Sequence, residues 1–467
     1  MLRTHRGVVL FGALLFLLAQ IADAQGKPEY GLHDLVDSAL THLPAIKQKA
    51  SQLGLARAGT RELKHLQLPQ WRLMEQVNLG TDNSLSGTVF PLGILPSSSG
   101  GIRADQNGSA ATGNLAVLYG EYELYNFGLN HSRIERSLSV EDLQRSDMER
   151  ERYLAVWRTT AWFLEAKSLE GLLRIDRQNV LRYDSIHTVV VALASSGIRA
   201  GADSSAALAE LSRARADLER DQGRLGELLD ALSSYAGVAP GTWLLHASNL
   251  PSGLSFATSQ FAARADTAKN PLVDPFQLQE RIIGLEEKLI RKEALPKLWL
   301  TGSAWARGSS IQYSDVYHGL GTGLGYQRYN YAAGLTLTYT LNNGLYRNDR
   351  LLSNRYAAEA AKQETKQQQL DLDIAVTQAE TRFRSLERRI TEGRIQVGAA
   401  EDSYRQRSAQ YRAGLISLID LTNASFVLYR SRADLLETEG QLWQALLDRS
   451  AHAGTLISFI QNIDRSW

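Results

Sequence analysis

Proline is absent from two very long spans of this chain, residues 97–239 and 297–467. Proline breaks helices, so these spans permit helices of unusual length. Within them, residues 129–194 and 345–413 are rich in helix-forming side chains and place apolar residues at helical spacing. Each segment predicts one helix of about 100 Å, which needs to pack against others of its kind. Shorter helices are expected at residues 32–66, 203–236, 262–294 and 418–447.

The chain contains two copies of one unit, because matching residues recur at a nearly constant offset. The matching positions, first copy then second, are Pro44 and Pro271, Pro69 and Pro296, Gly128 and Gly344, and residues 215–218 and 432–435. The offset shortens between the prolines and the glycines, where each copy has its strand-like sequence. Loops tolerate insertions, so the length difference is assigned to a hairpin loop.

Each copy holds two strand-like segments joined by a loop. The four expected strands are residues 71–79, 115–125, 298–307 and 331–341. Their lengths suit tilted transmembrane strands, and the loops at 81–112 and 308–330 are expected to face the cell exterior. Aromatic residues in them are candidates for membrane-interface girdles: Trp71, Tyr119, Tyr122, Tyr125, Trp299, Trp305 and Tyr339. Soluble hairpins are the alternative, since aromatics favour any strand.

Residues 1–24 are predicted to be a secretory signal peptide. Arg3 and Arg6 precede an apolar run at 8–18, and a small-x-small site follows at 22–24. A membrane-anchoring helix is the alternative, but the run is shorter than the roughly 20 residues that a spanning helix needs. No later stretch is long and apolar enough to span a membrane as a helix, so a membrane segment of this chain has to be built from strands.

Composition excludes several classes of protein. The chain has no cysteine, which removes disulfides, thiol nucleophiles and thiolate metal sites. Its net charge is +1 without a basic block, so no nucleic-acid partner is expected. The histidines lack metal-site spacing and no phosphate-binding loop follows a strand. We therefore expect no enzyme, no catalytic residue, no bound metal and no cofactor.

The order and duplication of these features resemble the TolC-like outer-membrane efflux proteins, from about Leu32 to His452. The resemblance is carried by a Leu-Pro before the first strand of each pair, by turns at 125–128 and 341–344, and by Gly-x5-Asp turns at 197–203 and 414–420. It implies a mainly α-helical fold with a membrane β-barrel: a homotrimer whose twelve strands close one barrel, continued by a long α-helical periplasmic tunnel. A closed sheet is also what lipid demands, because four strands are too few to satisfy their own edges.

The implied organisation has two repeats with irregular equatorial segments. The boundaries are 25–237 for the first repeat, 238–261 for an equatorial linker, 262–448 for the second repeat and 449–467 for a C-terminal equatorial tail.

The resemblance implies a passive exit duct for a tripartite efflux pump or a type I secretion system. The implied location is the cell outer membrane, with an extension into the periplasm, and the implied partners are outer-membrane lipid, a periplasmic adaptor and an inner-membrane pump. The sequence does not distinguish drug, metal ion or polypeptide as cargo. A secreted periplasmic coiled-coil adaptor or structural protein is the alternative, because long helical hairpins look alike in both.

The same resemblance places a gate at the helix tips. Its candidate residues are Asp203, Tyr411, Asp420 and Asn423, and the adaptor-docking turns contain Gly197, Gly201 and Gly414. Asn423 stands where the family has a second ring aspartate, and Ile416 where some members have arginine. The alternative is that Asp203 and Asp420 cap the helices that follow.

Overall fold

The computed structural model describes residues 27–83, 105–196, 201–246 and 270–465. The chain divides into two compact units, and each unit takes segments from both sequence copies. The helical unit combines the residues up to Leu53 with Leu143–Gln277 and Lys362–Trp467. The sheet unit combines Gly54–Asp142 with Leu278–Ala361.

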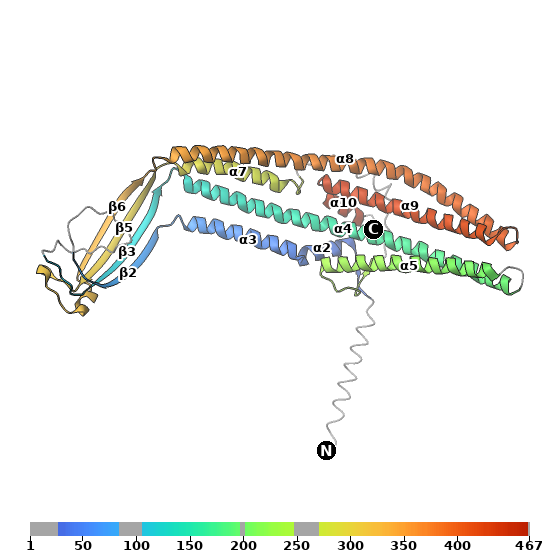
Figure 1. Ribbon diagram of the computed structural model, residues 1–467. Coiled ribbons are helices and arrows are strands. Elements are labelled where there is room, and N and C mark those ends of the chain that lie inside the picture. Colours follow the sequence, from blue (N-terminus) through green and yellow to red (C-terminus); the bar gives the residue numbers. More distant parts are fainter. Residues whose placement is uncertain (1–26, 84–104, 197–200, 247–269, 466–467) are drawn as a thin grey trace, which may run out of the picture. The chain divides into compact units, whose positions relative to one another are not determined.

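Two helices are far longer than the rest, as the proline-free spans predict (Figure 1). They are α4 (Leu129–Ser195) and α8 (Asn343–Arg412). The other helices are α2 (Leu32–His42), α3 (Pro44–His65), α5 (Gly201–Ala236), α7 (Asp274–Glu293), α9 (Leu418–His452) and α10 (Leu456–Arg465). None of the helices in the described residues is long and apolar enough to cross a membrane.

The core of the helical unit lies where α2, α4, α9 and α10 meet. Phe163 of α4, Trp443 and Leu446 of α9 and Phe459 of α10 are among its buried side chains. Two glycines allow α4 and α9 to approach closely. A Cβ at Gly171 would lie 3.1 Å from Leu436, and one at Gly440 would lie 2.6 Å from Ser168 Oγ.

A small parallel strand pair adjoins this core. β1 (Glu29–Tyr30) pairs with β4 (Leu244–Leu245). The ammonium of Lys167, on α4, is almost fully buried and donates to Glu170 and to the carbonyl of His246. Because an unpaired buried ammonium is costly, this pairing fixes the end of β4 against α4.

Four expectations need correction. The expected helix at 32–66 is broken between α2 and α3, because proline at 44 disfavours helical backbone at Leu43. The helix expected from 262 begins at Asp274, and residues 262–269 lie outside the described part. The last strand is shifted from 331–341 to Arg328–Thr338. The tail after 449 is not irregular: α9 continues to His452 and α10 follows.

The sheet unit contains one four-stranded antiparallel sheet in the order β2-β3-β5-β6. Its strands are β2 (Gln70–Gly80), β3 (Ala111–Tyr125), β5 (Lys297–Ser309) and β6 (Arg328–Thr338). The central contact, β3 with β5, joins the two hairpins of the duplication. β2 and β6 are the edges, and every residue of both is exposed.

The sheet has one apolar and one mainly polar face, because residues paired in register share a face and neighbours alternate. The apolar face carries Trp71, Leu73, Leu118, Leu300, Ala304, Tyr331, Ala333, Leu335 and Leu337. The polar face carries Arg72, Gln76, Glu121, Thr301, Ser303, Asn330 and Thr336, and Arg72 donates to Glu121 over 2.5 Å.

The expected aromatic girdles are therefore only partly on one face. Trp71 and Tyr122 share the apolar face, whereas Tyr119, Trp299 and Trp305 lie on the polar face. Tyr339 lies beyond the end of β6. Gly120 is needed beside Trp71, since a Cβ there would lie 2.5 Å from the indole ring.

Candidate gate at the ends of the long helices

Each of the two long helices is followed along the chain by a second helix. We call α4 with α5 the first hairpin and α8 with α9 the second hairpin. Residues 197–200 connect α4 to α5 in the sequence and lie outside the described residues, so the position of Gly197 is outside them too. In the second hairpin, Gly414 has φ +77°. Its N–H donates to the carbonyl of Tyr411, and the N–H of Leu415 donates to that of Gln410. This Schellman turn favours glycine at 414.

Asp420 belongs to a capping box at the start of α9. Ser417 Oγ accepts from the N–H of Asp420, and Asp420 Oδ2 accepts from the N–H and hydroxyl of Ser417 at 3.2 and 2.6 Å. The other carboxylate oxygen lies 3.9 Å from Arg407 on α8. The bonds from Ser417, followed by the charge of Arg407, lower the pKa of Asp420. Capping is thus real here, with Ser417 as the N-cap and Asp420 as its partner.

Tyr411 is buried at the point where the two hairpins meet. Its side chain is 3% exposed and belongs to an apolar cluster drawn from all four helices. The other buried members are Tyr183, Ile186, Val190, Ala207, Leu211, Ala214, Leu418 and Leu421. This cluster holds the ends of α4 and α8 together.

The remaining candidate residues lie near the starts of α5 and α9. Asp203 is half-buried in the first turn of α5, one turn before the buried Ala207. Asn423 is exposed on α9, one turn after Asp420. Gly201 begins α5, and a Cβ there would contact nothing within 4 Å. The backbone therefore requires glycine at 414 but not at 201.

A set of polar contacts missed from sequence ties α4 to the second hairpin. Asp176 accepts a 2.9 Å hydrogen bond from Tyr429. Arg182 donates to the carbonyl and hydroxyl oxygens of Ser425 at 3.5 and 3.4 Å. The third contact runs from Arg432 to Gln178 Oε1 over 3.1 Å. We name these three contacts the hairpin clasp.

Asp176 is the unusual member of the clasp. It is 1% exposed, and its Oδ2 has no hydrogen-bond partner among the described residues. Burial raises the pKa of the Asp176 carboxyl, as do the charges of Asp221 and Asp217, while the Tyr429 hydroxyl opposes the shift. A charged form of this group is therefore disfavoured in the folded helices.

Asp176→Asn should stabilise the helical unit increasingly as pH rises. Because the folded-state pKa of Asp176 is raised, its contribution to stability is fully present below the unfolded-state value of about 3.9 and falls as pH rises through the folded-state value. Asparagine keeps the acceptor for Tyr429 and has no charge. Thermal melting of both proteins between about pH 4 and pH 7 should show a widening advantage for the variant. A constant loss of stability at every pH would contradict this.

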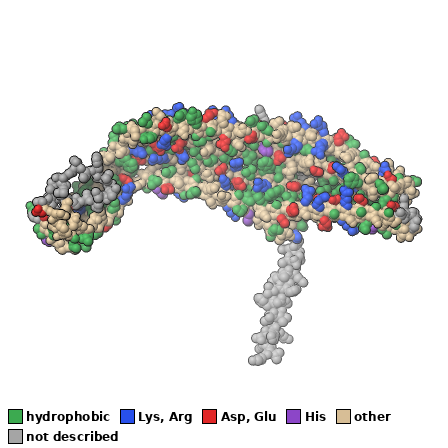
Figure 2. Space-filling view, viewed as in Figure 1, with side chains coloured by type: hydrophobic (Ala, Val, Ile, Leu, Met, Phe, Trp, Pro, Cys, Tyr) green, Lys and Arg blue, Asp and Glu red, His purple; other side chains and the backbone are tan. Residues whose placement is uncertain are grey.

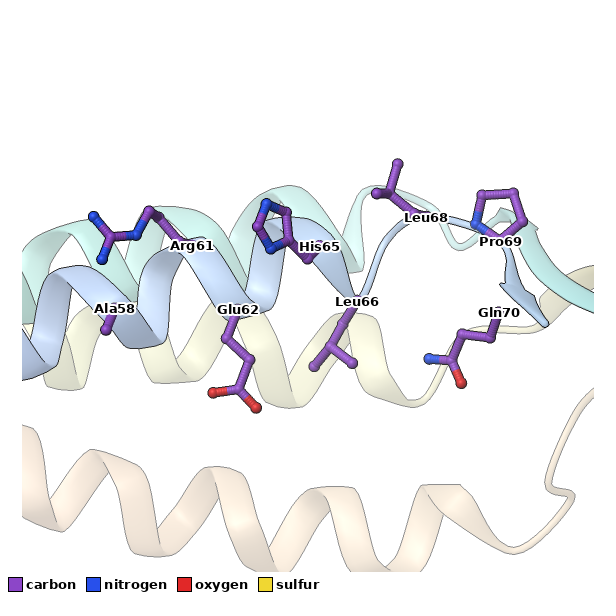
Figure 3. Close-up of a pocket in the computed structure, with 8 residues that line it drawn as sticks. All are labelled: Ala58, Arg61, Glu62, His65, Leu66, Leu68, Pro69 and Gln70. Atoms are coloured by element: carbon purple, nitrogen blue, oxygen red, sulfur yellow. The ribbon is translucent and has the colours of Figure 1, made fainter. Parts of the chain in front are cut away.

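A hollow of about 490 Å³ lies in the sheet unit, along the end of α3 and the start of β2 (Figure 3). Arg61 and His65 point to one side of the segment, whereas Glu62 points to the other. The polar groups that line the hollow do not converge on one point, whereas those of a catalytic site do. Within the described residues, no group of three or more His, Asp or Glu side chains is arranged to hold a metal ion.

Charge is spread over the helices rather than gathered. In Figure 2, Lys and Arg side chains alternate with Asp and Glu over the visible face. Several are paired between helices, such as Arg136 with Glu286, Arg350 with Glu293 and Arg432 with Glu401. Solvated pairs of this kind contribute little stability, about 0 to 1 kcal/mol each.

Residues 287–451 match the family model described as outer membrane efflux protein. The fold resembles VceC from Vibrio cholerae, with a TM-score of 0.73, 14% identity and coverage of 91% of this chain and 96% of that one. The resemblance to the TolC-like outer-membrane efflux proteins is confirmed.

Two further solved channels with this efflux-protein fold are similar. The CmeC outer membrane channel of Campylobacter jejuni has a TM-score of 0.70 at 13% identity, with coverage of 91% of this chain and 86% of that one. The open state of the Neisseria gonorrhoeae MtrE outer membrane channel has a TM-score of 0.67 at 15% identity, with coverage of 91% of this chain and 89% of that one. No curated protein sequence matches the chain.

Proposed function

We propose that this chain is one subunit of a homotrimeric outer-membrane channel, which acts as a passive exit duct for a tripartite efflux pump or a type I secretion system. A periplasmic adaptor and an inner-membrane pump are the proposed partners. The proposal rests on the efflux-family match together with one observation: a two-faced, four-stranded sheet with both long edges exposed.

The exposed edges favour assembly. β2 and β6 each present unpaired backbone groups along 11 residues. In lipid, each such group costs several kcal/mol, so an open sheet is not stable there. Three copies joined edge to edge would supply twelve strands and close the barrel. The apolar face would contact lipid, and the polar face would line the lumen.

The helical hairpins favour a gated tunnel as a second part of the channel. In this proposal Asp203, Tyr411, Asp420 and Asn423 form the gate, and the turns with Gly197, Gly201 and Gly414 dock the adaptor. The clasp and the buried cluster around Tyr411 hold the two hairpins of one subunit together, so opening has to move the hairpins without unfolding them.

The protein should run as a trimer in mild detergent and show heat-sensitive mobility on gels. Only the assembled state pairs the backbone groups along the strand edges, so the trimer should persist in mild detergent. Heating should convert it to monomer. Analytical ultracentrifugation in the same detergent would measure the mass. The rival function, a secreted periplasmic adaptor or structural protein, predicts a detergent-free monomer with full helicity, and that result would overturn the channel.

A further inference from the structure

The connection between β5 and β6, residues 310–327, folds back over the apolar face of the sheet. We call it the rim loop. A Cβ at Gly308 would lie 2.0 Å from the carbonyl oxygen of Gly325, so loop backbone rests directly on β5. Asn114 on β3 donates to the carbonyl of Leu324 over 2.8 Å. Residues 114 and 308 pair in register on the same face as Leu118.

The rim loop reaches as far as the edge strand β2. Thr112 Oγ1 donates to the carbonyl of Leu320, and the Tyr326 hydroxyl lies 2.9 Å from both carboxylate oxygens of Glu75. Glu75 is the charged residue of β2 on the otherwise apolar face. The loop thus crosses three strands and gives this carboxylate a hydrogen-bond donor.

Part of the rim-loop backbone is hydrogen-bonded within the protein. Ser310 donates to Thr112, Gln312 to Val316, His318 to Ser310, Thr322 to Gly319 and Gln327 to Arg307, all through main-chain N–H and C=O groups. Lipid-exposed irregular backbone does not occur within the hydrocarbon region of a membrane. The rim loop can therefore lie at the hydrated lipid interface but not in the hydrocarbon core.

The exposed side chains of the rim loop include apolar and aromatic residues, beside polar ones such as Gln312 and His318. Tyr313 is 95% exposed, and Val316, Leu320 and Leu324 are each 45 to 50% exposed. The segment 310–327 contains no Lys or Arg. Apart from its tyrosines, its titratable residues are Asp315 and His318. The loop therefore offers no lysine or arginine to lipid phosphate groups.

We propose that the rim loop is an interfacial anchor, which lies in the layer between headgroups and acyl chains of the outer leaflet. This inference rests on the proposed function. It follows from the continuity of the loop with the apolar face of the sheet, and from tyrosine and leucine side chains that suit a layer with one apolar and one wet side. The loop extends the lipid contact of each subunit beyond the strands.

Cysteine labelling can test the depth of the loop, because the chain has no native cysteine. Leu320→Cys would carry an environment-sensitive fluorophore in protein reconstituted into phosphatidylcholine vesicles. The vesicles would contain lipids with a nitroxide near the headgroup or deep in the acyl chain. Leu335→Cys on the apolar face and Thr336→Cys on the polar face are the matched controls.

The label at 320 should lose most fluorescence with the shallow nitroxide, the label at 335 with the deep one, and the label at 336 with an aqueous quencher. Quenching at 335 without any lipid quenching at 320 would overturn the anchor and leave the channel standing. Absence of lipid quenching at 335 would overturn both proposals. Tyr313→Cys serves as a second loop position and should behave as 320 does.

Discussion

Leu335→Arg should prevent stable assembly in the outer membrane, whereas Thr336→Arg should not. Leu335 lies on the apolar face of β6 and is 64% exposed, and its neighbour Thr336 lies on the polar face. An arginine facing the middle of a bilayer costs about 2 to 4 kcal/mol, and a trimer would contain it three times. The total is comparable to the whole stability of a typical protein.

The amount of heat-sensitive trimer in isolated outer membranes measures this effect. The two variants have the same added charge at neighbouring positions of the same strand, so the main difference between them is the face that carries the arginine. Equal recovery of both variants would contradict a lipid-facing apolar side. Equal loss of both would indicate that β6 does not tolerate arginine for another reason.

Replacing Tyr411 by Phe together with Asp203 by Ala should raise single-channel conductance. In the proposed closed gate, the Tyr411 hydroxyl donates a hydrogen bond to Asp203. A hydrogen bond to a charged group contributes about 1.5 to 3 kcal/mol, and a trimer would contain three copies. Tyr411 of α8 is buried in the cluster that also contains Ala207 of α5, one turn after Asp203. Planar-bilayer recordings measure the effect, and unchanged conductance in an intact trimer would contradict it.

Asp420 should make the gate favour cations, but weakly. Arg407 lies 3.9 Å from the carboxylate of Asp420 and offsets its negative charge. Asn423 is neutral and adds no negative charge. Asp420→Ala should lower cation selectivity and block by multivalent cations, whereas Arg407→Gln should raise both. Ser417→Ala is the control: it removes the cap at a cost of about 0.5 to 2 kcal/mol and keeps the carboxylate. A selectivity change in Ser417→Ala equal to that in Asp420→Ala would favour capping alone.

Sequence periodicity predicted the long helices closely, because proline placement and apolar spacing act along one segment. It placed β6 three residues too late, since alternation continues to Leu341 while pairing with β5 ends at Thr338. Pairing depends on the partner strand, which a single segment does not contain. The spacing of Leu456, Phe459, Ile460 and Ile463 is helical and indicates α10, but the expected irregular tail followed the family resemblance instead.

The gate was harder to predict than the fold. The Gly-x5-Asp pattern correctly located the turn at Gly414, where φ is positive, and the first turn of α9. The hairpin clasp was not found, because Asp176 and Arg182 lie in a stretch of mixed charge that reads as a solvated helical face. Which polar residues meet across helices depends on how the hairpins pack, and periodicity does not contain that information.

Closure of the sheet by three copies is the central claim, and cross-linking of its edges tests it most directly. Gln76→Cys on β2 and Asn330→Cys on β6 place one exposed thiol on each edge, both on the polar face, in a chain with no other cysteine. A flexible bismaleimide applied to the membrane-embedded double variant should give dimers and trimers and nothing larger, because a closed ring has no free edge. A ladder beyond the trimer, or monomer alone, would contradict the account.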